Sequence, residues 1–451
     1  MKIIYPLLSL VIVWAGSTTY ALEAGAARVN LVPPTPATMG GYFDRKDPFE
    51  GVSTPIYARA LVVSNEETTL GVVVLDLCYV SRELTDQARV EIEKQTGIPG
   101  ENIVVSATHT HSAPSGFMGA RFLGRVEQPE LSKFLLAQTI EAVVTAYKNL
   151  EPAQAGFAYG DLPGMTRNRQ QENDLVDPQV GVLKVQKKDS REYIAVLANY
   201  TGHPVILGGN NLLLSSEFPG AACTTVEDTL GGVAILTQGA CGDVTVHRSG
   251  DAYEEVKRVG RVLGGEIIKT AEQIRPTENV PLFSKFQPVD VEPRDLPSVK
   301  QAQANINALE KAHEAAKSDD SPDYIVKKLR REVNAANTTM AVARGVAGND
   351  QLLGYGTHTR TQVIQIGDMI AVAIPGEMFV EYQLEIKHRI AQDTGKSAIV
   401  IGYANDYIGY IITPRADKTG GYEKAISRVA ASAGRTLTEA AIEIVQQNIH
   451  R

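Results

Sequence analysis

The sequence contains very little tryptophan and few cysteines, and beyond its first residues it has no apolar run long enough to cross a membrane. The single tryptophan, Trp14, lies within the first 21 residues. Three cysteines in 451 residues exclude a disulfide-rich scaffold, so stability has to come from a hydrophobic core. The formal net charge of -8 argues against nucleic acid as a partner and gives no electrostatic reason to bind an anionic lipid surface.

The N-terminal segment has the order of features typical of a secretory signal peptide. Lys2 is followed by an apolar run over 3–15 and then by small and polar residues up to Ala21. The run is short for a bilayer span, so a retained anchor is the weaker alternative. We therefore expect a signal peptide at 1–21, a single domain at 22–451 without a transmembrane anchor after cleavage, and a secreted or periplasmic protein.

The rest of the chain alternates between short β-rich runs and helical patterns, which predicts the α/β class. Predicted strands cover 57–63, 70–77, 102–107, 155–159, 180–185 and 193–199, and predicted helices cover 81–96 and 128–150. Two adjacent strands joined by the polar link 187–191 predict a β-hairpin. We therefore expect mixed β-sheets packed together and flanked by helices, not a purely parallel sheet.

One segment differs from the rest in composition. Residues 298–344 are rich in Ala, Lys, Glu and Asn, and the polar stretch 318–322 interrupts them in the middle. This pattern predicts a helical hairpin inserted on the surface of the domain. Its charges favour a plain solvated hairpin, and a lid over a functional site is the alternative.

Several predicted strands end in reactive residues instead of ordinary turns. The carboxyl ends of strands are where α/β folds form ligand sites, so we expect these segments to converge. The strand at 103–107 is followed by His109 and His111, and the strand at 194–198 by His203. Asp243 follows the strand at 233–236, and Glu377 follows the strand at 369–374. The strand at 398–401 runs into the stretch 402–406.

The histidines point to a metal site. His313 and His388 lie in charged helical surroundings and His450 is near the terminus, which leaves five site candidates: His109, His111, His203, His247 and His358. In an extended His109-Thr110-His111 both imidazoles would lie on one face, and two imidazoles with a further histidine and a carboxylate suit zinc. Scattered histidines without regular spacing are equally compatible with ordinary structural roles.

A set of short motifs, taken in order, resembles the catalytic domain of the neutral/alkaline non-lysosomal ceramidases. The resemblance spans about 27–444, and the printed chain ends where longer members of that family continue into an immunoglobulin-like domain. The motifs are Gly40-Gly41-Tyr42, Tyr57-Ala-Arg-Ala-Leu61, Ser106-Ala-Thr-His-Thr-His-Ser112, Asn168-Arg169, Gly202-His203-Pro204, Gly242-Asp243-Val244-Thr245, Pro375-Gly376-Glu377 and Gly402-Tyr-Ala-Asn-Asp-Tyr-Ile-Gly-Tyr410.

The resemblance implies a zinc ion and its ligands. In the family the ligands are the first histidine of His-Thr-His, a histidine before proline, the glutamate of Pro-Gly-Glu and a tyrosine in the Gly-Tyr-Ala-Asn region. At the matching positions this chain has His109, His203, Glu377 and Tyr410.

The same resemblance implies the catalytic residues. His111 would move a proton to the leaving group, while Arg169 and Tyr422, twelve positions after Tyr410, would donate hydrogen bonds to the substrate. Thr245 stands where the family has a serine, and Val246-His247 replaces the family's Pro-Asn. This departure puts specificity for ceramide in doubt.

We therefore expect a zinc-dependent hydrolase that cleaves the amide bond of ceramide or a related N-acyl lipid by attack of a metal-activated water. The alternatives are hydrolysis of a polar amide or ester, such as an acylated sugar, and a non-catalytic binding protein on the same scaffold. The expected partner is a small-molecule or lipid-like substrate, and the sequence gives no oligomeric state. Asp76 and Asp243 are expected to support the site or the backbone, and a cysteine nucleophile is a weaker reading.

Overall fold

The structure is a computed structural model that describes residues 21–42, 45–119, 127–170, 174–319, 321–347 and 357–449. Side chains of residues 323, 324, 327, 328 and 345–347 are not described. The predicted signal peptide, apart from its last residue, lies outside the described residues. Within those residues, no helix combines the length and the apolar character needed to span a bilayer.

The first layer of the protein is a mixed eight-stranded sheet in the order β11-β9-β8-β6-β1-β3-β4-β5. Neighbours are antiparallel except in the parallel pairs β11 with β9 and β4 with β5. The predicted hairpin is confirmed as the antiparallel pair β8 and β9. The strands are β1 (Leu22–Asn30), β3 (Tyr57–Ser64), β4 (Thr69–Leu75), β5 (Ile103–Ala107), β6 (Glu151–Asp161), β8 (Gln179–Lys187), β9 (Tyr193–Tyr200) and β11 (Val233–Gln238).

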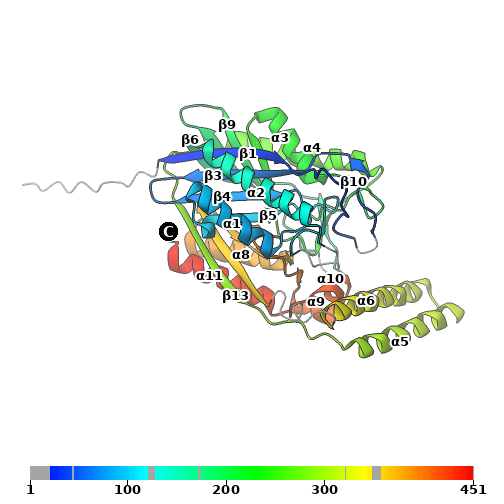
Figure 1. Cartoon of the computed structure of the whole chain (residues 1–451). Coiled ribbons are helices and arrows are strands. Elements are labelled where there is room, and N and C mark those ends of the chain that lie inside the picture. Colours follow the sequence, from blue (N-terminus) through cyan, green and yellow to red (C-terminus); the bar gives the residue numbers. More distant parts are fainter. Residues whose placement is uncertain are drawn as a thin grey trace, which may run out of the picture.

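A second, four-stranded sheet packs on one face of the first (Figure 1). Its order is β13-β14-β15-β17, from strands Leu282–Asp290, His358–Ile366, Met369–Ala373 and Ser397–Ile401. Alternation within the strands builds this interface: Leu61 and Val63 of β3 join the core between the sheets, whereas Ala60 and Val62 join the core under the helices. Short pairs complete the fold: β2 (Gly51–Val52) with β10 (Leu213–Leu214), β7 (Thr166–Asn168) with β12 (Val244–Val246), and β16 (Glu377–Met378) with β18 (Tyr410–Ile411).

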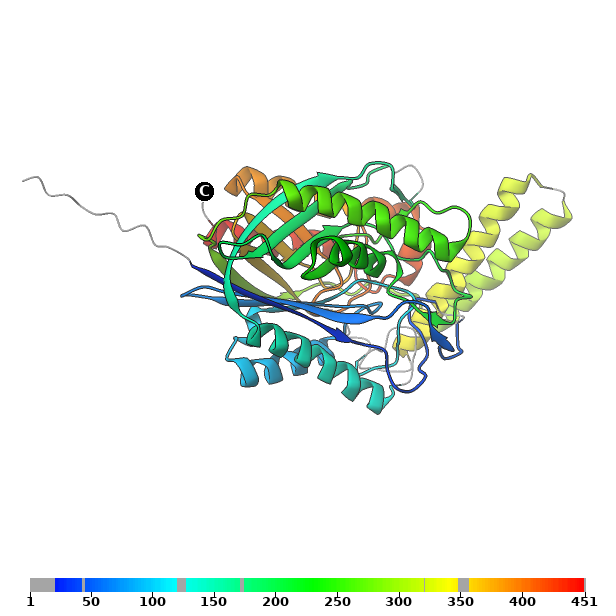
Figure 2. The ribbon, with the colours of Figure 1, turned by 90° about the horizontal axis from the view of Figure 1, so that it is seen from above.

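Helices cover the two outer faces (Figures 1 and 2). On the large sheet these are α1 (Arg82–Thr96), α2 (Pro129–Lys148), α3 (Glu217–Leu230) and α4 (Ala252–Gln273), and on the small sheet α8 (Val380–Thr394) and α11 (Ala433–Asn448). The predicted helix start at Ser81 is confirmed, because its side chain accepts from the Leu84 amide, and Gly97 ends α1 in the left-handed conformation. A 3-10 turn (Gly100–Asn102) leads into β5, and short helices α9 (Pro414–Thr419) and α10 (Tyr422–Ile426) follow β18. The predicted α/β architecture of packed mixed sheets is confirmed.

The inserted hairpin is present as α5 (Val299–Ser318) and α6 (Asp323–Ala347), which extend away from the sandwich (Figures 1 and 2). Its two helices share a small core of their own, made by Ala302, Ile306, Ala336 and Met340. At its base α6 packs against α10, where the Thr339 hydroxyl donates to the Ala425 carbonyl. Val342 of α6 also belongs to the main hydrophobic core, so α6 anchors the hairpin to the domain.

Candidate active site

The ends of β5 and β9 bring two of the predicted zinc ligands together, although β5 is one edge strand of the sheet and β9 lies next to the other edge strand, β11. The large sheet curls until β11 contacts β4 and β5. Gln238, the last residue of β11, fastens both loops: its side-chain amide donates to the carbonyls of Thr108 and Gly202, and its side-chain oxygen accepts from the Gly202 amide. His109 directly follows Thr108, and His203 directly follows Gly202.

The backbone of His109 is not extended as the sequence analysis assumed. It has a φ of 65°, in the left-handed region that non-glycine residues seldom occupy. Both imidazoles of the His-Thr-His motif nevertheless point the same way, with His111 Nε2 3.2 Å from His109 Nε2. The prediction of a shared face is correct and its stated reason is wrong. Such strain persists only where the surroundings fix it, which is typical of functional sites.

Hydrogen bonds at Nδ1 set the tautomers of two histidines. His109 Nδ1 lies 2.5 Å from the Cys78 carbonyl oxygen, and His203 Nδ1 lies 3.2 Å from the Cys241 carbonyl oxygen. A carbonyl can only accept, so Nδ1 carries the proton in both rings and each Nε2 keeps its lone pair. His111 differs, because its buried Nδ1 has no hydrogen-bond partner. The Nδ1 hydrogen bonds thus prepare His109 and His203 as metal ligands, and His111 Nε2 lies 3.2 Å from both of their Nε2 atoms.

Glu377 reaches the same point through the short strand pair β16 and β18, in which it lies beside Tyr410. Its Oε1 accepts from the Tyr407 hydroxyl. Its Oε2 is buried, accepts no hydrogen bond, and lies 3.4 Å from His109 Nε2 and 4.0 Å from His203 Nε2. Burial raises the pKa of Glu377, whereas the positive charge that His109 carries when its ring is protonated, together with the hydroxyls of Tyr407 and Tyr410, lowers it.

This donor set fits a divalent cation. The ligand atoms of His109, His203 and Glu377 all lie within 4.8 Å of one another, and His109 Nε2 and His203 Nε2 are 2.9 Å apart. Since both Nε2 atoms carry lone pairs, no hydrogen bond can join them, and a shared cation is what would stabilise the arrangement together with the free oxygen of Glu377. Two neutral imidazoles and one carboxylate are a typical set for zinc.

Tyr410 and Arg169 connect this centre to a cavity. Arg169 Nη2 lies 3.4 Å from the Tyr410 hydroxyl and 3.0 Å from Glu423 Oε1, and it also donates to the Gly242 carbonyl. Burial opposes the charge on Arg169, but Tyr410 and Glu423 outweigh burial and raise its pKa. A fixed guanidinium therefore stands between the buried donors and the cavity.

Tyr422, the other predicted tyrosine, lines the cavity and is 47% exposed. Its ring meets that of Tyr410 edge to face, with centroids 6.1 Å apart. Partial burial, followed by the charge of Glu377, raises the pKa of its hydroxyl, which therefore stays protonated and able to donate. Of the four predicted catalytic residues, Arg169 and Tyr422 face the cavity directly, and His111 lies just behind its wall, against Gly41.

The backbone of Thr245 fixes where this residue lies. It lies in β12, forms a bridge with His203, and is followed and preceded by core valines. It does not line the cavity among the described residues. The structure thus puts the residue that replaces the family's serine beside a candidate metal ligand.

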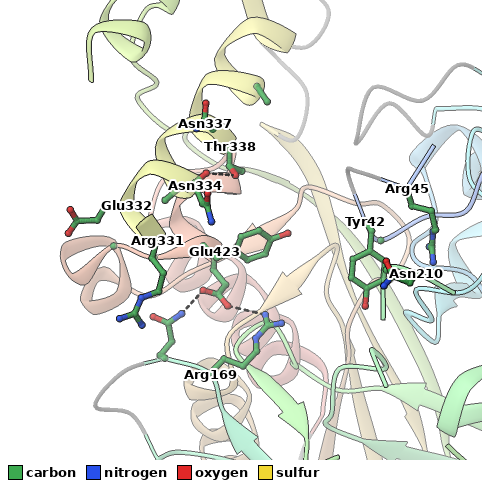
Figure 3. Close-up of a pocket in the computed structure, with 18 of the residues that line it drawn as sticks. Tyr42, Arg45, Arg169, Asn210, Arg331, Glu332, Asn334, Asn337, Thr338 and Glu423 are labelled. Atoms are coloured by element: carbon green, nitrogen blue, oxygen red, sulfur yellow. Dashed lines mark hydrogen bonds and ion pairs between the residues drawn. The ribbon is translucent and has the colours of Figure 1, made fainter. Parts of the chain in front are cut away.

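The cavity has a volume of about 1730 Å³. Figure 3 shows Tyr42 and Asn210 on one side, the face of α6 with Asn334 and Asn337 on the other, and Arg169 between them. The second helix of the inserted hairpin is therefore one wall of the cavity. This corrects the favoured reading of a plain solvated hairpin, because a stretch of α6 lines the cavity, where Asn334 and Asn337 remain solvent-exposed.

The remaining candidates lie elsewhere. His247 is exposed after β12, and His358 is an exposed partner of Asp290, 2.6 Å from its carboxylate. Asp76 pairs with buried Arg59 and accepts from the Thr108 hydroxyl, so it supports the loop that carries His109. Asp243 accepts from the Val380 amide and from Asn168, which is the structural role considered for it.

The three thiols do not form a nucleophilic centre. Burial raises the pKa of Cys78, Cys223 and Cys241. A raised pKa leaves little thiolate, so the weak standing of a cysteine nucleophile is supported.

The sequence analysis missed four supporting residues. Tyr403 stacks on His109 with centroids 3.9 Å apart, Tyr407 holds one oxygen of Glu377, Gln238 fastens the histidine loops, and Glu423 pairs with Arg169. Tyr403 and Tyr407 lie within the motif that ends at Tyr410, so their closeness to a ligand was a usable signal. Gln238 and Glu423 gave none, because their roles depend on how the sheet curls and where α10 lies.

These features define an α/β protein with a buried His-His-Glu donor cluster, which Tyr410 and Arg169 connect to a cavity. Residues 25–257 match the model of the neutral/alkaline non-lysosomal ceramidase N-terminal domain, and the chain belongs to that family. The expected family is confirmed.

Individual relatives are distant. The neutral ceramidase of Mycobacterium tuberculosis is 20% identical over 70% of this chain and 58% of its own length. Neutral ceramidase B of Dictyostelium discoideum is 21% identical over 91% of this chain and 68% of its own length. The crystal structure of the neutral ceramidase from Pseudomonas aeruginosa superposes with a TM-score of 0.77 at 17% identity, over 96% of this chain and 75% of that one, which shows a shared fold.

Proposed function

We propose that the protein is a zinc-dependent hydrolase of the carbon–nitrogen bond in N-acylated amines. The observation that carries the proposal is the pair of lone-pair-bearing Nε2 atoms, on His109 and His203, that face the one unbonded oxygen of Glu377. Tyr410, paired with Glu377 across β16 and β18, completes the ligand set. When bound, zinc lowers the pKa of a water molecule to about 7 and polarises a carbonyl, which is what an unreactive amide requires.

The other residues would bind and orient the substrate. Arg169 and Tyr422 face the cavity with N–H and O–H donors that suit the oxygen of an amide carbonyl. Tyr407 keeps one oxygen of Glu377 occupied, so that the other is presented to the metal. Thr245, beside His203, would orient the substrate or stabilise charge.

His111 would carry the proton to the leaving amine. Its Nδ1 has no partner, and a Cβ placed on Gly41 would lie 2.3 Å from that atom, so Nδ1 sits just behind a residue of the cavity wall. Burial lowers the pKa of His111, which keeps the ring neutral and means that a proton it takes up is readily passed on.

Ceramide or a related N-acyl lipid is the substrate suggested by the names of the relatives. A polar amide or ester is the second candidate, and the four carboxamide side chains that line the cavity favour it. A non-catalytic binding protein is disfavoured because all four proposed ligands are retained. The N-terminal segment supports a secreted or periplasmic location, which remains part of the proposal.

Metal analysis of the purified protein tests the proposal. We expect one zinc per chain, lost together with hydrolysis in a His109→Ala, His203→Ala double variant and restored by zinc after chelation of the wild type. His358→Ala is the matched control, since that histidine is an exposed partner of Asp290. A wild type that binds no divalent metal, or a double variant that still hydrolyses amides, would refute it.

A further inference from the structure

The walls of the cavity differ from what a lipid tail requires. Among the described residues that line it, Leu212 is the one aliphatic side chain larger than alanine. Four carboxamides line the same space: Gln170, Asn210, Asn334 and Asn337. A pocket for long acyl chains needs mostly apolar walls, with few polar groups.

Energetics point the same way. Burying a methylene against apolar surface contributes about 0.8 kcal/mol, but this gain requires an apolar wall. A tail laid over carboxamides would strip their water without replacing the hydrogen bonds, at a cost of about 1–3 kcal/mol for each group. Hydroxyl groups avoid this cost because they donate and accept, as carboxamides do.

The inserted hairpin supplies much of this polar surface. Asn334, Asn337 and Thr338 follow the three- and four-residue spacing that puts side chains on one helical face, and Figure 3 shows them together on α6. Tyr42 and Asn210 lie across the cavity (Figure 3), and Tyr422 also lines it. A tyrosine ring offers an apolar face and a polar tip, which suits the two kinds of surface on a sugar ring.

We propose that the substrate is an N-acylated, polyhydroxylated amine of the amino-sugar type with a short acyl group, and that helix α6 selects it. The inference rests on the proposed hydrolase function. The carboxamides of α6 and of the opposite wall bind the hydroxyl groups, while Arg169 and Tyr422 hold the amide carbonyl near the metal centre. Water is added across the amide bond, giving a carboxylic acid and a free amine.

A matched substrate pair tests the proposal. N-hexanoylglucosamine and N-hexanoylsphingosine carry the same acyl group on different amines, and N-palmitoylsphingosine adds a long chain. We expect kcat/KM to be at least tenfold higher for the glucosamine derivative. A preference for either sphingosine derivative would overturn this inference and leave the hydrolase function intact.

Variants of α6 test the role of the helix. Asn334→Ala, Asn337→Ala should raise KM for N-hexanoylglucosamine about tenfold with kcat nearly unchanged, because two hydrogen bonds of about 0.5–1.5 kcal/mol each are lost. Asn305→Ala, Asn307→Ala on the exposed part of α5 is the matched control and should behave as the wild type. Equal KM in both double variants would refute selection by α6.

Binding separates failure of the inference from failure of the function. The His109→Ala, His203→Ala variant should still bind N-hexanoylglucosamine by calorimetry, and the added α6 substitutions should abolish that binding. Binding without any hydrolysis by the wild type would refute the hydrolase while supporting the polar ligand. An absence of binding in every variant would overturn the inference.

Discussion

The candidate metal site lies behind Arg169, which lines the same cavity as the α6 wall, and the two regions are held in different ways. His109, His203 and Glu377 are nearly inaccessible, come from strand ends inside the sandwich, and are fixed by hydrogen bonds to buried groups. The α6 wall belongs to an insertion with its own small core, which α6 joins to the domain through Thr339 and Val342. If the proposed function holds, the difference teaches that the chemistry would be built into the sandwich, while the inserted hairpin would contribute selectivity.

The strongest test of this division replaces the negatively charged ligand Glu377 with a neutral side chain of the same shape. Glu377→Gln should reduce amide hydrolysis on the order of 1000-fold, because loss of a ligand costs more than the 10- to 100-fold typical of its outer partners. Glu332→Gln, which changes a carboxylate on the α6 wall, should change activity less than about threefold. Steady-state kinetics and zinc content would check both, and equal effects would abolish the distinction between the two regions.

The variant Tyr407→Phe tests whether the hydrogen bond to Glu377 contributes to zinc binding. The variant frees Oε1 of Glu377, so the carboxylate can rotate, and we expect zinc affinity to fall about 10- to 100-fold. Competition with a chelator would measure this. Tyr159→Phe is the control, since that hydroxyl donates to the Ala398 carbonyl away from the cluster. Unchanged affinity in Tyr407→Phe would show that the hydrogen bond does not position the ligand.

The same division explains what could be predicted from the sequence. Helix α1 was predicted because its cap at Ser81 and its end at Gly97 are local signals. The strand ends that carry His109 and His203 were visible because a buried run followed by a reactive residue is also local, and the resemblance then supplied the ligand set.

What could not be predicted depends on tertiary geometry. The left-handed backbone of His109 is imposed by its surroundings, and no residue pattern encodes it. The bond from Tyr407 to Glu377 requires β16 to lie beside β18. The wall formed by Asn334 and Asn337 was missed because a polar helix face reads as solvated unless its neighbour across the cavity is known.

Weakening the hairpin core should affect the wall and spare the metal centre. Ile306→Ala removes part of the contact between α5 and α6, and we expect a local loss of about 2 kcal/mol, the low end for such substitutions because this cluster is small. Hydrogen exchange should quicken in both helices. Zinc content should stay at the wild-type level, and loss of zinc in this variant would show that the two regions are coupled.

The smallest expected effect concerns Glu217, a buried carboxyl at the start of α3 that belongs to neither region. Burial raises its pKa from 4.5 to about 7, so the folded protein holds a proton that the unfolded chain releases near pH 4.5. Its contribution to stability is therefore complete below pH 4.5 and is lost as the pH rises through 7. Linkage gives a fall of about 1 kcal/mol in the free energy of unfolding between pH 6 and pH 7.

Glu217→Gln should flatten the slope of unfolding free energy between pH 6 and pH 7 in denaturant titrations. Asp243→Asn is the matched comparison, because burial raises the pKa of Asp243 to about 6 and its slope lies mainly below that pH. Asp243 touches Asn168, next to Arg169, so only its variant should also alter catalysis. If Glu217→Gln kept the full slope, a titrating group nearer the candidate metal site would have to cause it. That group would then account for the pH dependence of both stability and activity.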